Sequence, residues 1–115
     1  MTPALILAST SRYRKELLTR LGVAFSCDKP ETDESAHEGE TPRALALRLA
    51  AEKARAVAHR HPNSLIIGSD QVASCAGERF GKPGNEERAI AQLVAMSGKT
   101  VIFDTAVALL ETRTD

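Results

Sequence analysis

Hydroxyl and cationic side chains gather near the start of the chain, where they could bind an anion. Ser9 and Ser11 follow a short apolar run, and Arg14 falls in the first turn of an expected helix. The first N–H groups of a helix lack partners within it, so they can donate to phosphate oxygens together with hydroxyl groups. An arginine fork adds charge-assisted hydrogen bonds. The segment therefore predicts phosphate binding, although a simple cap at Ser11 and a solvated Arg14 explain the same spacing equally well.

Asp70 is the residue whose position best suits catalysis. It follows the apolar run Leu65–Ile67 and lies in the polar stretch Gly68–Gln71, so it should emerge at the carboxyl end of a strand, where α/β folds bind ligands. A carboxylate there could hold Mg²⁺ or accept a proton from an attacking water. Capping of the turn after the strand is the structural alternative. A functional role is favoured because consecutive polar groups are costly to bury without partners.

Further charged residues could complete a site for a phosphorylated small molecule. Glu31, Asp33 and Glu34 could supply a second carboxylate for a hard cation, although most acidic loops are merely solvated. Lys53 shares a helical face with apolar residues, where a lysine either reaches a phosphate or extends along apolar surface to solvent. Lys82 lies in a stiff glycine–proline turn that suits it to phosphate binding.

The elements that position these side chains follow from apolar periodicity and turn residues. We expect strands at 4–8, 23–27, 65–68 and 100–110, with 71–76 continuing the third strand or pairing with it. We expect helices from a Ser11 cap to Leu21, from Thr41–Pro42 to a stop before Pro62, and from an Asn85 cap to Gly98. Residues 28–40 and 77–85 are rich in turn formers or charge and predict loops.

This alternation of strands and helices predicts an α/β fold with a mixed twisted sheet flanked by helices. The 115 residues suit a single domain spanning 1–115. The runs 65–68 and 101–110 are apolar at successive positions, which predicts central strands covered on both faces. A sheet edge beyond the last strand would need pairing or protection.

Composition narrows the class of protein. The chain is 43% hydrophobic and 26% charged, as in ordinary globular proteins, and its 15 basic and 15 acidic residues cancel. We therefore expect no nucleic acid or membrane partner, and no transmembrane run or signal peptide is visible. Cys27 and Cys75 lie outside any CxxC pair, which is typical of reduced thiols in a cytoplasmic protein. A Walker loop is absent, which excludes a P-loop protein.

The ordered motifs resemble those of the Maf-like family of nucleotide pyrophosphatases. The resemblance spans essentially the whole chain and rests on the segments Leu7–Arg14, Asp33–Glu34, Glu52–Ala54, Gly68–Gln71 and Gly81–Pro83. It implies a fold of the Maf and inosine-triphosphatase type with an active-site cleft. It also implies cleavage of a nucleoside triphosphate substrate between the α- and β-phosphates, with a divalent cation, Mg²⁺ or Mn²⁺, as cofactor.

The resemblance also assigns roles to individual residues. Asp70 matches the proton acceptor of the family and, with Glu34, its metal-binding carboxylates. The matching substrate-binding residues are Ser9, Ser11, Arg14, Lys53 and Lys82. Tyr13 and Gln71 match positions that govern base choice, and their types resemble the branch that hydrolyses 7-methyl-GTP. The branch acting on dTTP and UTP usually carries arginine and threonine there.

Three alternatives remain open at this stage. The base could differ, as in a dTTP or UTP pyrophosphatase. Family members continue past the last residue of this chain, so we expect the fold to be incomplete at its C-terminus, and an inactive nucleotide-binding remnant is the second alternative. An incomplete fold that needs a partner chain at its open sheet edge is the third, and a homodimer stays open. The leading expectation is a cytoplasmic enzyme that removes modified nucleotides.

Overall fold

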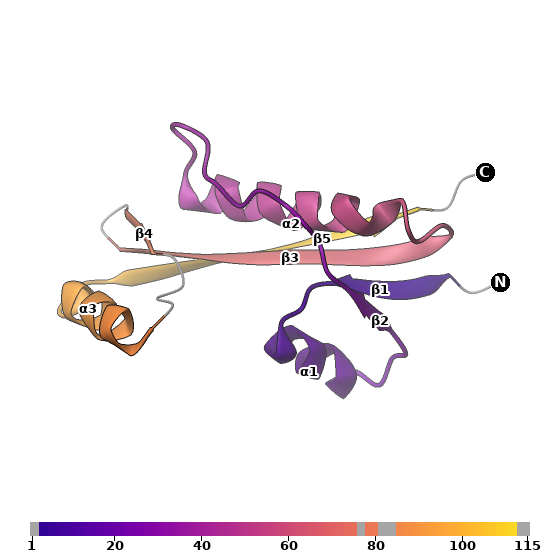
Figure 1. Ribbon diagram of the computed structural model, residues 1–115, viewed down its shortest axis with the longest axis horizontal. Helices are drawn as coiled ribbons and strands as arrows, with labels where there is room; N and C mark the ends of the chain where they lie inside the picture. The colour runs from indigo at the N-terminus through magenta and orange to yellow at the C-terminus, as the bar shows by residue number, and fades with distance from the viewer. Residues whose placement is uncertain (1–2, 76–77, 81–84, 113–115) are drawn as a thin grey trace.

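The structure is a computed structural model that describes residues 3–75, 78–80 and 85–112, and it confirms the expected α/β fold (Figure 1). Within these ranges five strands form one mixed sheet and three helices flank it. In chain order the elements are β1 (Ala4–Ala8), α1 (Arg12–Arg20), β2 (Ser26–Asp28), α2 (Pro42–Ala58), β3 (Ser64–Cys75), β4 (Glu78–Phe80), α3 (Glu86–Met96) and β5 (Val101–Glu111).

The sheet is built around β3, its longest strand. β5 runs antiparallel along nearly the whole of β3, with Asp70 opposite Ala106. β1 pairs in parallel with the first part of β3, and β4 pairs antiparallel with its last part. Because β5 occupies one side of β3 throughout, β1 and β4 share the other side, and β2 extends the sheet beyond β1. The carboxyl ends of β1 and β2 therefore meet at one edge, with Ala8 opposite Asp28.

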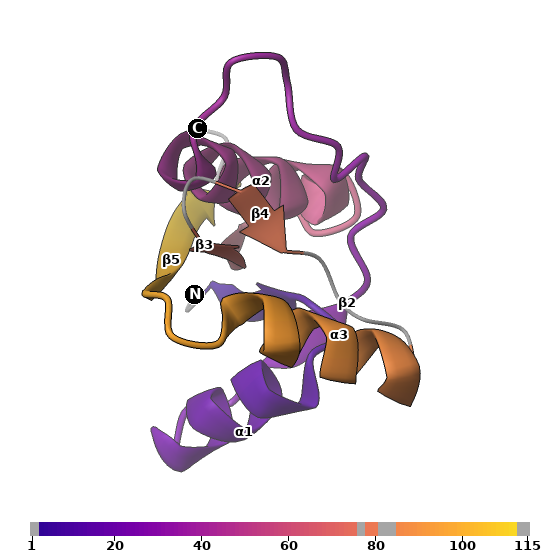
Figure 2. The same cartoon turned by 90° about the vertical axis from the view of Figure 1, so that its left-hand side faces the viewer.

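α2 covers one face of β3 and β5, and the apolar core lies between them (Figure 2). The helix begins at an N-cap, Thr41, whose hydroxyl oxygen accepts a hydrogen bond from the N–H of Ala44 at 3.1 Å, and proline occupies its first turn. Leu45 and Val57 of α2 and Ile66 of β3 are the largest fully buried side chains. Burial of one such side chain contributes roughly 1.5–3 kcal/mol, so this contact fixes the helix on the sheet.

A glycine sets the distance between α2 and β3. A Cβ atom at Gly68 would lie 2.1 Å from the carbonyl oxygen of Ala50 and 2.8 Å from the amide nitrogen of Ala54. Any side chain here would push the helix backbone away from the strand. The close approach brings Lys53 of α2 over Asp70 of β3.

α1 lies on the opposite side of the sheet from α2, at the carboxyl end of β1 (Figures 1 and 2). Ser11 caps it as expected, since its hydroxyl oxygen accepts from the N–H of Arg14 at 3.3 Å. The helix ends at Arg20 with Leu21 as its C-cap, and Gly22 follows with a φ of +75°, a conformation that favours glycine. Asn85 caps α3 in the same way, through Arg88.

Residues 71–75 continue β3, which is one of the two arrangements expected for them. The structure corrects two details of the expected elements: β2 begins at Ser26 instead of residue 23, and the predicted loop 77–85 contains the short strand β4. Both differences concern short segments. Whether such a segment forms a strand depends on the strand with which it pairs, and the local sequence does not show which strand that is.

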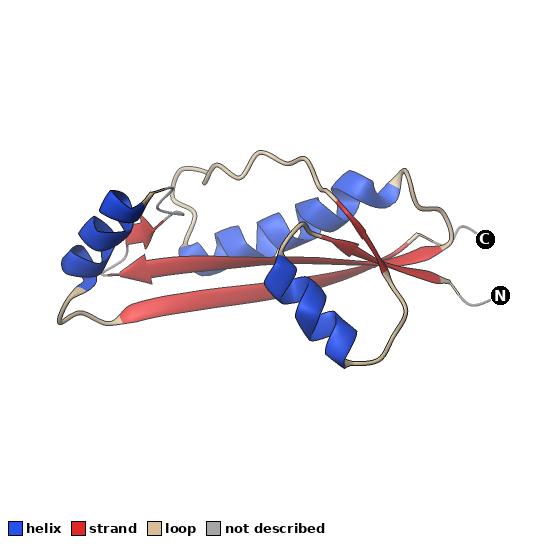
Figure 3. Ribbon diagram, turned by 60° about the horizontal axis from the view of Figure 1, so that its bottom comes forward, coloured by secondary structure: helices blue, strands red, loops and turns tan. Residues whose placement is uncertain are grey.

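The position of β5 also differs from the expected central strand covered on both faces. Among the described residues β5 pairs with β3 alone, and α2 covers only one of its faces (Figure 3). The opposite face carries Phe103, Val107 and Leu109, which are 61%, 69% and 66% exposed. An apolar run in the sequence therefore does not distinguish a strand that is covered on both faces from a strand at the edge of the sheet. Cys27 and Cys75 are both free thiols, as expected.

Candidate active site

A buried lysine on α2 joins two carboxylates from other parts of the fold. Nζ of Lys53 donates to Oδ1 of Asp70 at 2.7 Å and lies 2.8 Å from Oε1 of Glu34. The side chains of Lys53 and Asp70 are each 11% exposed, whereas that of Glu34 is 60% exposed. Opposite charges at this depth are tolerated when they are paired and hydrogen-bonded. The ion pair with Lys53 therefore fixes the carboxylate of Asp70 in the interior, and the carboxylate of Glu34 approaches the same ammonium group from the solvent side.

Two serine hydroxyls at the start of α1 form the second part of the site. Oγ of Ser9 accepts from the N–H of Ser11 at 3.0 Å, and Oγ of Ser11 accepts from the N–H of Arg14 at 3.3 Å. A hydroxyl that accepts a hydrogen bond still has its own proton to donate. Both side chains are thereby held in place with a donor available to an anion.

These two groups of residues line one cavity of about 560 Å³. Ser9, Ser11 and Arg14 form one part of its wall, and Lys53 and Glu34 form another. The volume lies in the range of small-molecule binding sites. Hydroxyl, guanidinium and ammonium donors beside a carboxylate suit a ligand that carries several phosphates and a bound cation.

Of the other predicted site residues, Glu31 also lines the cavity. Asp70 lies in the middle of β3 and not at the carboxyl end of a strand as expected, because the polar residues 68–71 continue the strand; it reaches the site through Lys53. Tyr13 is 70% exposed on α1, and Gln71 is exposed on the face of β3 opposite Asp70, because successive strand residues alternate between faces. Neither lines the described cavity, so their role in base choice stays a prediction. Lys82 lies outside the described residues.

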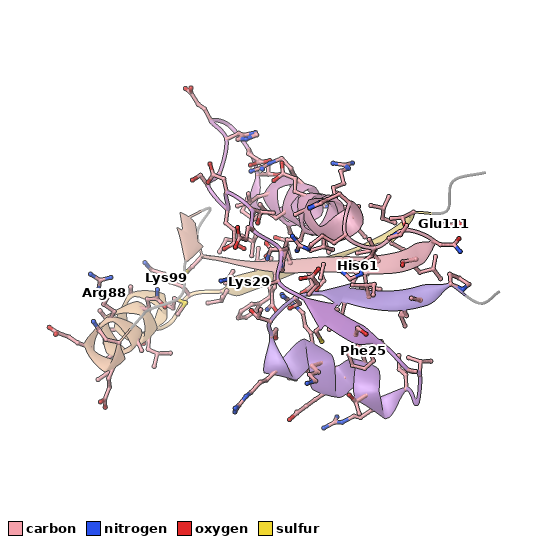
Figure 4. All side chains as sticks on the ribbon, turned by 45° about the vertical axis from the view of Figure 1, so that its right-hand side comes forward. Phe25, Lys29, His61, Arg88, Lys99 and Glu111 are labelled. Atoms are coloured by element: carbon pink, nitrogen blue, oxygen red, sulfur yellow. The ribbon has the colours of Figure 1, made fainter. Side chains whose placement is uncertain are left out.

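The sequence-based site lacked several cavity residues, among them two polar ones in the segment that follows β2. Lys29, labelled in Figure 4, and Thr32 both line the cavity. The signal that could have found them is the parallel pairing of β1 with β2, which puts the residues after both strands at one edge. Lys29 adds a further cation beside the hydroxyl groups.

Ion pairs fasten this segment at both of its ends, one to the turn that follows α2 and the other to α2 itself. Nε of Arg60 donates to Oδ2 of Asp28 at 2.9 Å, and Nε2 of His61 lies 2.7 Å from the same oxygen. At the other end Arg48 of α2 binds Glu40 through two hydrogen bonds. The guanidinium group of Arg48 lowers the pKa of Glu40 to about 2, and Arg60 with His61 lowers the pKa of Asp28 to about 2.

The lowered pKa of Asp28 makes a testable contribution to stability. Because the unfolded chain binds the proton more readily than the folded one, this contribution is complete above the ordinary pKa of 3.8 and is lost as the pH falls through about 2. We expect Asp28→Asn to lower the free energy of unfolding at pH 6 and to have a smaller effect at pH 3. Urea denaturation of both proteins at the two pH values measures the difference. An equal effect at both values would contradict the assignment.

Phosphate-binding donors that follow the carboxyl ends of two parallel strands, β1 and β2, are typical of nucleotide-binding α/β folds. A family model described as "Maf-like protein" matches residues 4–115, and the chain belongs to this family. The resemblance seen in the sequence motifs is thereby confirmed.

Curated relatives carry the name 7-methyl-GTP pyrophosphatase. The chain is 61% identical over 110 residues to the protein of that name from Xanthomonas campestris pv. campestris (strain 8004), covering 96% of this chain and 57% of the relative. It is 58% identical over 106 residues to the protein from Albidiferax ferrireducens, covering 92% and 53%. With the Burkholderia lata protein the identity is 56% over 115 residues, covering 97% and 55%. The chain therefore spans little more than half the length of these relatives.

Within the described residues, no helix combines the length and the apolar character that a membrane span requires.

Proposed function

We propose that the protein is a nucleoside triphosphate pyrophosphatase that hydrolyses 7-methyl-GTP to 7-methyl-GMP and diphosphate. The observation that carries this proposal is the Lys53–Asp70 ion pair beside a cavity lined by phosphate-binding donors. The names of the relatives support the reaction and the substrate. Removal of a modified nucleotide in the cytoplasm is the role we infer, and the two free thiols suit that compartment.

Each group at the cavity has a chemical task in this reaction. Ser9, Ser11 and Arg14 hold phosphate oxygens, and the charge of Lys53 offsets negative charge that grows on the leaving diphosphate. Asp70 accepts the proton of the attacking water, which adds to the nucleotide while the bond to the diphosphate breaks. The ion pair with Lys53 keeps Asp70 oriented toward that task.

The donor set fits a divalent cation that binds together with the nucleotide. Among the described residues no group of three or more metal-binding side chains occurs, so a site made by the protein alone is not shown. Glu34 and Asp70 nevertheless contact the same ammonium group, which places two carboxylates close together. Mg²⁺ is commonly held by one or two carboxylates, substrate phosphates and water, and Mn²⁺ accepts similar ligands. A bound cation supplies charge neutralisation at the phosphates.

We expect metal removal to abolish pyrophosphate release and to weaken nucleotide binding, because two carboxylates would then face the phosphates with Lys53 as their nearest counterion. Calorimetric titration of Mn²⁺ should show weak binding to the protein alone and at least tenfold tighter binding with 7-methyl-GMP and diphosphate present. Glu34→Gln should remove most of that gain. Equal Mn²⁺ affinity with and without the products would contradict the shared site.

Tyr13 offers a test of base choice. N7-methylated guanine is cationic, so an aromatic face could bind it by about 1–2 kcal/mol of cation–π attraction. We expect Tyr13→Arg to lower kcat/KM for 7-methyl-GTP by roughly 5- to 30-fold, the equivalent of that energy. Turnover of GTP, dTTP and UTP serves as the control and should change little. An equal loss on all four nucleotides would assign Tyr13 to folding or general binding.

We further propose that two copies of the chain associate through β5. Antiparallel pairing of β5 about Ala106 would set Phe103 of each copy opposite Leu109 of the other, so that exposed apolar side chains of the two copies would pack side by side on one face of the joined sheet. Sedimentation velocity should show a mass that rises with protein concentration. Val107→Lys, on the exposed face, should give a monomer at every concentration; an unchanged distribution would contradict this interface.

A further inference from the structure

Arg48 makes an unusually complete set of hydrogen bonds at the middle of α2. Nε donates to Oε2 of Glu40 at 2.7 Å, and Nη2 donates to Oε1 of the same carboxylate at 2.9 Å. Nη2 also donates to the carbonyl oxygen of Ser35 at 2.8 Å. Nη1 donates to both carboxylate oxygens of Glu52 at 3.1 Å. The planar guanidinium group thus joins α2 to two separate points of the loop at residues 29–40.

One of the two loop contacts of Arg48 lies directly beside a residue of the candidate active site. Ser35 directly follows Glu34, whose carboxylate reaches Lys53 further along the same helix. Arg48 and Lys53 therefore hold neighbouring residues of the loop, one through its backbone and the other through its side chain. The position of the Glu34 carboxylate over the cavity depends on where the backbone at Ser35 lies.

Burial indicates which contact holds the loop. The side chain of Glu34 is 60% exposed, and an ion pair so open to water contributes little to stability. The side chains of Arg48 and Glu40 are only 20% and 10% exposed, and their fork-shaped pairing has two short hydrogen bonds. The contact between Arg48 and Glu40 is therefore the better anchor, and the contact between Lys53 and Glu34 follows from it.

We propose that Arg48 is a positioning residue that holds the loop so that Glu34 faces the cavity and can contribute to cation and nucleotide binding. The expected effect on metal binding rests on the proposed function, whereas the expected effect on the loop is independent of catalysis. Arg48 lies outside the cavity wall and acts through Ser35 and Glu40.

Hydrogen exchange measures the structural consequence directly. In Arg48→Ala we expect amide exchange of residues 31–38 to rise at least tenfold, with α2 and β3 remaining protected. Arg55→Ala is the matched control, since it removes an exposed arginine from the same helix, and Glu52→Gln removes the pairing within the helix while keeping the loop contacts. Both should leave loop exchange unchanged. Unchanged exchange in Arg48→Ala would overturn the proposal, whether or not the protein has activity.

A metal titration measures the functional consequence. Removing a residue that orients a metal ligand commonly weakens metal binding by 10- to 100-fold, so we expect the Mn²⁺ concentration for half-maximal binding with nucleotide products to rise by about that factor in Arg48→Ala. Arg48→Lys should recover only part of the loss: lysine keeps the positive charge, but an ammonium group cannot form the fork-shaped pair of hydrogen bonds. If Arg48→Ala does not fold, Glu40→Gln weakens the same anchor from the loop side. Faster loop exchange with unchanged Mn²⁺ affinity would limit Arg48 to a structural role and overturn the proposal.

Discussion

Asp70→Asn should lower the rate of pyrophosphate release from 7-methyl-GTP by about 10²–10⁴-fold, the usual contribution of a general base. The amide oxygen of asparagine can still accept the hydrogen bond from Nζ of Lys53, so the geometry around the ion pair should persist. What the substitution removes is the ability to take a proton from water. Single-turnover kinetics at saturating nucleotide separates this loss from a loss of binding.

A second aspartate on the same face of the sheet provides the matched control for Asp70. Asp104 lies on β5, opposite Val72, and forms no ion pair with Lys53 among the described residues. Asp104→Asn should keep activity within about threefold of the parent protein. Retention of similar activity by Asp70→Asn would assign the proton acceptor to another residue.

Gly68→Ala should destabilise the fold by about 3 kcal/mol, the upper end of the usual cost of overpacking. The added methyl group would clash with the backbone of α2 at Ala50 and Ala54, and a backbone cannot move aside as a flexible side chain can. Relief of the clash requires α2 to move away from β3, which would also separate Lys53 from Asp70. Urea denaturation measures the stability, and residual activity of the folded fraction reports the site.

Gly22→Ala is the control for the Gly68 prediction. Gly22 has a φ of +75° and open space around it, so alanine there meets only conformational strain. The left-handed conformation costs an ordinary residue roughly 1–2 kcal/mol, less than the expected loss at Gly68. A smaller effect at Gly68 than at Gly22 would contradict the close approach of helix and strand.

The elements governed by local rules could be predicted from the sequence. Ser11, Thr41 and Asn85 cap the three helices of the described structure as expected, because each supplies an oxygen to an N–H group a few residues away. The polar stretch that contains Asp70 could also be recognised from local sequence, because it interrupts an apolar run at a defined position.

Features that depend on distant parts of the chain were not predictable in this way. The sequence shows neither that Arg48 meets the carbonyl group of Ser35 nor that Lys29 lines the cavity, because both contacts depend on the path of a loop. The role of Gly68 was hidden too, since a glycine in a polar motif suggests a turn, whereas the structure uses it for helix packing. Gln71 was grouped with Asp70 because both belong to one family motif, and the alternation of faces along β3 separates their side chains.

The most direct test of the proposed activity is pyrophosphate release by the purified 115-residue protein with Mg²⁺, using 7-methyl-GTP, GTP, dTTP and UTP in parallel. Circular dichroism first establishes that the protein is folded. The proposal predicts that 7-methyl-GTP is converted to 7-methyl-GMP and diphosphate faster than the other three, and that Asp70→Asn lowers this turnover by about 10²–10⁴-fold. Absence of release from all four nucleotides by the folded protein would contradict it.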